Sequence, residues 1–91
     1  MGYHWLPGLV AILRGIEPHE ILQALEASVR WPRSAAGSDG RPYLTIWART
    51  AAGRPIMVVT KPDGPLEWVI IGAQPLTAEQ TAEFAAWEAS R

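Results

Sequence analysis

The feature that most constrains this chain is its second half, residues 41–88, which reads as three strands on tight turns followed by a capped helix. Between Tyr43 and Arg49, side chains alternate in the period-2 pattern of a half-buried strand. Residues 56–60 form a β-branched run that suits a central strand, and residues 66–73 predict a third long strand. The turns are predicted at residues 51–54 (AAGR) and 61–65 (KPDGP), because glycine and proline favour tight reversals.

The helix after these strands is predicted from its cap. Thr77 followed by Gln80 fits a capping box, in which each side chain bonds a backbone N–H of the other residue. The helix then runs to about Ala89 and carries an alanine stripe along one face. Such a stripe allows close approach to a sheet or to a partner helix.

The first half of the chain predicts two helices joined by a short connection. Pro7 suits the first position of a helix, and Gly15 suits its end. A second helix begins near Pro18, with apolar side chains at helical spacing. Residues 3–5 (YHW) are too short to assign from periodicity, and residues 29–33 could form a strand that Pro32 would confine to an edge. Residues 34–40 read as a flexible loop.

These segments predict one α+β domain over residues 1–91, since the chain is too short for two independent cores. The expected architecture is two N-terminal helices, a twisted antiparallel sheet of three to four strands, and a C-terminal helix. The 48% apolar fraction is that of a globular protein, and most of the five tryptophans are expected to fill its core.

Composition excludes several classes of function. Cysteine is absent, which removes disulfides and thiol chemistry. The two histidines, His4 and His19, lie 15 positions apart without a matched acidic pair, so no metal site is expected. No cofactor is expected either, because no nucleotide-loop or other cofactor motif is present. No apolar run is long enough for a membrane span and no signal peptide is evident, so we expect a cytoplasmic protein.

Charge is segregated along the chain although the net charge is only −1. Residues 29–61 contain one acidic residue, Asp39, and six basic ones, which are Arg30, Arg33, Arg41, Arg49, Arg54 and Lys61. All six fall on or beside the predicted strands, so the sheet could present a basic face to RNA. Alternatively, the sheet arginines pair with glutamates of the helices on a solvated face.

Candidate site residues follow from this basic face. Arg41, Arg49 and Arg54 bracket the first hairpin, where arginine forks suit phosphate recognition. Tyr43 and Trp47 share a face with Arg49, and aromatic side chains among basic ones suit stacking of unpaired bases. Lys61 stands at the second turn as a further RNA contact. His4 is the candidate for proton transfer, because histidine titrates near neutral pH; its alternative role is a structural hydrogen bond.

Five short motifs resemble the BrnT toxin family. They are residues 13–16 (LRGI), 19–22 (HEIL), 48–54 (ARTAAGR), 58–60 (VVT) and 71–77 (IGAQPLT). The family consists of small endoribonucleases with a RelE-like fold, each paired with a ribbon-helix-helix antitoxin. The resemblance, which covers residues 13–87, implies an RNA or ribosome substrate and an antitoxin partner. For such a ribonuclease the candidate catalytic residues are His4, Arg14 and Arg49. His4 or Arg14 would assist proton transfer or charge stabilisation, and Arg49 would help to hold the phosphate.

The chain departs from the family pattern at its basic positions. Arg14 stands where the family has histidine, and Gln74 stands where the family has arginine; Pro75, Ala78 and Glu79 replace nearby basic residues. A ribonuclease of this type needs cations around the scissile phosphate. The departures therefore keep a second interpretation open, in which the chain is a non-catalytic protein–protein interaction module. Such a module would bind a partner or a second copy of the chain through an exposed tryptophan and the alanine-rich helix.

Overall fold

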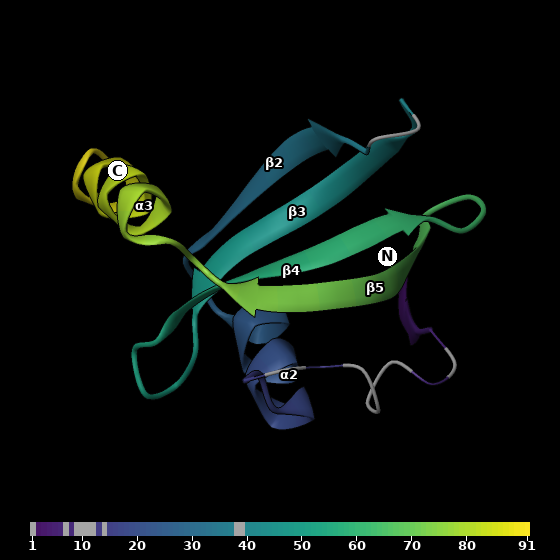
Figure 1. Cartoon of the computed structure of the whole chain (residues 1–91), viewed down its shortest axis with the longest axis horizontal. Coiled ribbons are helices and arrows are strands. Elements are labelled where there is room, and N and C mark those ends of the chain that lie inside the picture. The colour runs from purple at the N-terminus through teal and green to yellow at the C-terminus, as the bar shows by residue number, and fades with distance from the viewer. Residues whose placement is uncertain (1, 7, 9–12, 14, 38–39) are drawn as a thin grey trace.

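A five-stranded sheet forms the centre of the computed structural model, which describes residues 2–6, 8, 13, 15–37 and 40–91. The strands are β1 (Gly2–Trp5), β2 (Arg30–Ala36), β3 (Pro42–Arg49), β4 (Pro55–Pro62) and β5 (Glu67–Pro75). The helices are α2 (Pro18–Glu26) and α3 (Ala78–Ala89). Across the sheet the strand order is β1-β5-β4-β3-β2 (Figure 1). Helix α2 covers one face, and α3 lies near β2 at the end of the sheet where β5 stops (Figure 1).

The predicted architecture of two N-terminal helices and three to four antiparallel strands is wrong. The sheet has five strands and is mixed, because β1 pairs with β5 in parallel while the other three pairings are antiparallel. In the part of the chain that is described, one helix lies mid-chain and one is C-terminal. Most of the predicted first helix, including Pro7 and residues 9–12, lies outside the described residues, and Leu13 is not helical.

Pairing between distant segments explains both strands that the sequence left uncertain. Residues 2–5 show no period of their own and become a strand by bonding to the exposed edge of β5. β2 extends from Arg30 to Ala36, into the segment predicted to be a loop, because β3 pairs with all seven of its residues. Local signals were sufficient for the remaining elements: β3, β4, β5, α2 and α3 are confirmed near their predicted bounds.

The main core lies between α2 and the sheet. Its fully buried side chains include Ile21 of α2, Ile56 and Val58 of β4, and Ile70 of β5. These residues follow the alternation expected of strands and the three-to-four residue spacing expected of a helix. At about 25 cal/mol per Å² of buried apolar area, burial of this kind is the dominant favourable contribution to folding.

A second, aromatic core attaches α3 to the opposite face. Phe84 is completely buried, and the rings of Trp31 and Trp87 stack with centroids 5.0 Å apart and planes 1° apart. Trp47 meets Trp31 edge-to-face at 5.5 Å. The helix begins at the predicted capping box, where the Gln80 backbone N–H donates to Thr77 Oγ1 (3.1 Å) and the Thr77 N–H donates to Gln80 Oε1 (2.9 Å). One aromatic layer therefore holds α3 in place.

Candidate nucleic-acid interface

Three sheet arginines are ion-paired with glutamates of the helices. Arg33 Nη1 lies 2.8 Å from Glu83 Oε1 and Arg49 Nη2 lies 2.9 Å from Glu88 Oε1, both on α3. Arg54 Nη1 lies 3.1 Å from Glu20 Oε1 on α2. The alternative prediction, in which sheet arginines pair with helix glutamates, is therefore confirmed for these three residues. Their positive charge is locally neutralised and contributes little to an RNA-binding field.

Arg49 is the most fully engaged of these candidates. Its Nε donates to both oxygens of Glu88 at 3.1 Å, its Nη1 donates to the Gly53 carbonyl at 3.2 Å, and its guanidinium lies 5.5 Å from the Phe84 ring centre. The hydrogen bonds to Glu88 raise the pKa of Arg49 above its ordinary value. Through these contacts Arg49 holds the C-terminal end of α3 against the sheet.

The two candidate stacking residues differ in exposure. Trp47 is 5% exposed and belongs to the aromatic core, and its indole N–H has no hydrogen-bond partner among the described residues. Its ring offers no free face to a base in this arrangement. Tyr43, four positions away on the same strand, is only half-buried.

A cross-strand row on the face opposite α2 brings several other candidates together. The strand registers place His4 of β1 beside Val69 of β5, and Val69 beside Lys61 of β4. Tyr43 of β3 is the next residue along, because its neighbour Leu44 pairs with Thr60. With strands about 4.8 Å apart, the row from His4 to Tyr43 spans roughly 14 Å, the length of two to three nucleotides. We call this set the polar row after its three polar members, His4, Lys61 and Tyr43, which the apolar Val69 connects.

A hollow lies at the Tyr43 end of the polar row. It has a volume of about 340 Å³ and is lined by Arg41, Pro42, Tyr43, Lys61, Pro62 and Asp63. Two cations and an aromatic ring thus meet where β3 begins and β4 ends. Asp63 adds one negative charge, so the hollow favours a ligand that combines an anion with hydrogen-bonding groups.

At the other end of the polar row, His4 is paired with a carboxylate. His4 Nε2 lies 3.3 Å from Glu67 Oε2, and both side chains are about half exposed, at 52% and 51%. A carboxylate in contact with one ring nitrogen orients an imidazole and leaves the other ring nitrogen open to a ligand. The pair is therefore accessible to a ligand and suited to proton transfer.

The structure thus gathers His4, Arg41, Tyr43 and Lys61 along one side of the sheet and separates them from Arg49 and Arg54. Arg14 lies outside the described residues. Sequence reasoning missed Glu67 and Asp63, which join the site through strand register and through the β4–β5 turn. The only sequence signal was their position beside the KPDGP turn. In the described part of the chain, no group of three or more acidic or histidine side chains could hold a metal ion.

Comparisons with known proteins give no family assignment. No protein-family model matches the chain, and no curated protein matches it by sequence. Among the described residues, no helix is long and apolar enough to cross a membrane.

Proposed function

We propose that this chain binds single-stranded RNA along the polar row and cleaves it, as a diverged relative of the BrnT toxins that its motifs resemble. The observation that carries the proposal is the convergence of Lys61, Arg41 and Tyr43 on one hollow, in line with the His4–Glu67 pair. Cations hold phosphates, and a partly exposed tyrosine ring supplies a stacking surface for an unpaired base.

The proposed reaction uses no metal. The imidazole of His4, oriented by Glu67, takes the proton of a ribose 2′-hydroxyl as that oxygen attacks the adjacent phosphorus. Lys61 stabilises the negative charge that develops on the phosphate oxygens. The 5′-oxygen of the next nucleotide leaves with a proton from water, which gives a 2′,3′-cyclic phosphate and a free 5′-hydroxyl.

Binding and cleavage are tested separately. In a fluorescence-anisotropy titration of a labelled single-stranded RNA, Lys61→Ala should weaken binding and lower the slope of log K against log salt by about 0.7, the value for one phosphate contact. Tyr43→Ala should weaken binding about tenfold through lost stacking. The matched control is Arg91→Ala, which removes one cation at the far end of α3. Equal effects of Lys61→Ala and Arg91→Ala would contradict the proposed binding surface.

Cut-site mapping on a defined messenger RNA then tests the reaction. His4→Ala should lower the cleavage rate by about 10²-fold or more while RNA affinity changes little, because general acid–base catalysis contributes about that much. Glu67→Gln should lower the rate less than His4→Ala does, because Glu67 only orients the imidazole. Cleavage by the His4→Ala variant at the parental rate would remove His4 from the mechanism. RNA binding without cleavage by the parent protein would leave a binding protein only.

A protein–protein interaction module is the second candidate function, and the neutralised arginines favour it. Arg33, Arg49 and Arg54 are used to hold helices, so the basic face is smaller than the sequence predicts. The partners to test are a second copy of the chain and a ribbon-helix-helix antitoxin, the latter from the family resemblance. Light scattering on the purified protein, alone and with the product of any neighbouring small gene, distinguishes the two partners. A strict monomer in both experiments would reject this candidate.

A further inference from the structure

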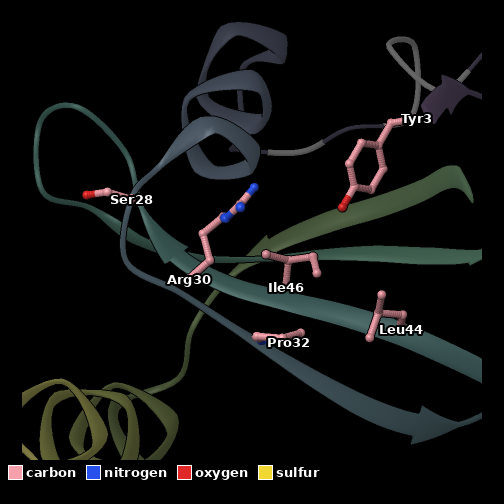
Figure 2. Close-up of a pocket in the computed structure, with 6 residues that line it drawn as sticks. All are labelled: Tyr3, Ser28, Arg30, Pro32, Leu44 and Ile46. Atoms are coloured by element: carbon pink, nitrogen blue, oxygen red, sulfur yellow. The ribbon is translucent and has the colours of Figure 1, made fainter. Parts of the chain in front are cut away.

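A second cavity lies on the opposite face of the sheet from the polar row. It has a volume of about 310 Å³ and is lined by Tyr3, Ser28, Arg30, Pro32, Leu44 and Ile46. Figure 2 shows the ring of Tyr3 entering from β1 and the guanidinium of Arg30 rising from β2, with Leu44, Ile46 and Pro32 below them. The cavity thus has an apolar floor and polar groups at its rim.

Arg30 differs from the three arginines that are paired with helix glutamates. Its Nη1 donates to the carbonyl of Leu25, in the last turn of α2, where a cation also complements the negative end of the helix. No carboxylate among the described residues lies within ion-pair distance of Arg30. Its guanidinium therefore keeps a net positive charge, and its remaining N–H groups are available at the rim of the cavity.

The chemistry of the lining defines the ligand. The guanidinium of Arg30 and the hydroxyl of Tyr3 match a group with a single negative charge and two acceptor oxygens, which is a carboxylate (Figure 2). The floor of Leu44 and Ile46 matches an apolar body. Since about 310 Å³ is at the lower end of ligand-binding cavities, the body must be small. We infer that this cavity binds a small monocarboxylic acid with an alkyl or aryl chain, a role beyond the proposed RNA function.

Octanoate is a suitable probe, with octanamide as its uncharged isostere. We expect octanoate to shift the backbone amide signals of Ser28, Arg30, Leu44 and Ile46 saturably in two-dimensional NMR spectra, while the signals of Tyr43 and Lys61 stay in place. Octanamide should bind at least tenfold more weakly, because it lacks the charge that Arg30 recognises. Equal binding of the two probes, or shifts that never saturate, would overturn the inference.

Two variants of β2 form a matched pair for the same titration. Arg30→Gln removes the charge but keeps an N–H donor for the Leu25 carbonyl, and it should weaken octanoate binding at least tenfold. Arg33→Gln removes one charge from the opposite face of the same strand and should leave binding unchanged. Amide spectra of both variants establish that they are folded. Unchanged binding by folded Arg30→Gln would reject the site.

The carboxy-terminal residue of a peptide carries the same chemistry as a small acid. N-acetyl-glycyl-leucine, titrated in the same way, distinguishes these sources, and we expect it to bind more weakly than octanoate because a 310 Å³ cavity has little room for backbone. Tighter binding of the peptide would reject the small-acid assignment. Loss of RNA binding in the Lys61→Ala variant has no bearing on this result, since Lys61 lies on the other face.

Discussion

Single residues of this chain act mainly through the partners that the fold gives them. Glu20 illustrates this most clearly. Its Oε1 accepts the backbone N–H of Glu17 at 2.9 Å and the Arg54 Nη1 at 3.1 Å, and its side chain is only 13% exposed. The pKa of the Glu20 carboxyl is therefore below its ordinary value of 4.5. The hydrogen bond from the Glu17 N–H is the largest cause and Arg54 is a further one, whereas burial acts in the opposite direction. One carboxylate therefore caps α2 and fixes the first hairpin.

This arrangement predicts a pH dependence of stability. Because the folded-state pKa of Glu20 is lowered, its contribution is fully present above about pH 4.5 and is lost as the pH falls through the folded-state value. Glu20→Gln should reduce stability at pH 7 and make the decline on acidification shallower, as measured by urea unfolding at several pH values. Glu79→Gln, an exposed carboxylate in the first turn of α3, is the control and should keep the parental slope. An identical slope for Glu20→Gln and the parent would contradict this account.

At the scale of elements, α3 depends on a thin contact layer. The layer includes Phe84 and Trp87 on the helix and Trp31 and Trp47 on the sheet, and Met57 and Leu76 are buried in the same cluster. Arg33 lies over both sheet tryptophans at 4.4 and 4.7 Å. The alanines of α3 at positions 78, 82, 85 and 89 face solvent, so its apolar attachment comes from a few aromatic rings. Local opening of α3 should therefore cost less than opening of the main core.

Trp31→Ala tests this dependence. Because Trp31 is only partly buried, we expect a loss of about 2–3 kcal/mol, below the range for a fully buried aromatic residue. Hydrogen exchange should speed up in α3 while the amides of β4 and β5 stay protected. Leu22→Ala, on an exposed leucine of α2, should change neither quantity appreciably. Uniform loss of protection throughout the sheet would show that α3 and the main core open together.

One residue in the turn between β4 and β5, Leu66, has a backbone conformation that leucine rarely adopts. Leu66 has a φ of 59°, and its side chain is 77% exposed. A left-handed conformation costs roughly 1–2 kcal/mol for such a residue, whereas asparagine adopts it more readily. Leu66→Asn should therefore stabilise the protein by about 0.5–1 kcal/mol in urea unfolding. Leu66→Ala, which keeps the strain, should give no such gain; destabilisation by Leu66→Asn would mean that the leucine side chain makes contacts of its own.

At the scale of the whole molecule, the two sheet edges, β1 and β2, decide whether copies can associate by strand pairing. β1 is only four residues long, and Pro32 stands within β2, where it has no N–H to offer a further strand. Short edge strands and prolines are devices that prevent edge-to-edge pairing. Both edges of this sheet are thus poorly suited to dimerisation through strand addition.

Replacing the proline should remove part of this protection. Pro32→Val supplies a backbone N–H and a β-branched side chain, so we expect a concentration-dependent increase in apparent mass by light scattering. Ser34→Val, which adds a β-branched side chain on the same strand but no new donor, is the control. If neither variant gains apparent mass over the parent, proline is not what prevents edge pairing.

Sequence alone determined the elements whose signals are local. The alternation along β3, the β-branched run of β4, the capping box at Thr77 and the turns at Gly53 and KPDGP all act within a few residues, and each stands near its predicted place. These signals also identified Tyr43, Lys61 and Arg41 as candidates before any contact was known. Local physical chemistry is sufficient for such features because each signal depends only on residues close together in the chain.

Only the tertiary structure decided which segments meet. The parallel addition of β1, the extension of β2 to Ala36, and the assignment of Arg49 to Glu88 and Arg54 to Glu20 depend on groups more than 30 residues apart in the chain or on another strand. A charge pattern shows that arginines are present but not which carboxylates will neutralise them. The polar row exists for the same reason: strand register places His4 in line with Lys61, and register is set by the burial of the opposite face.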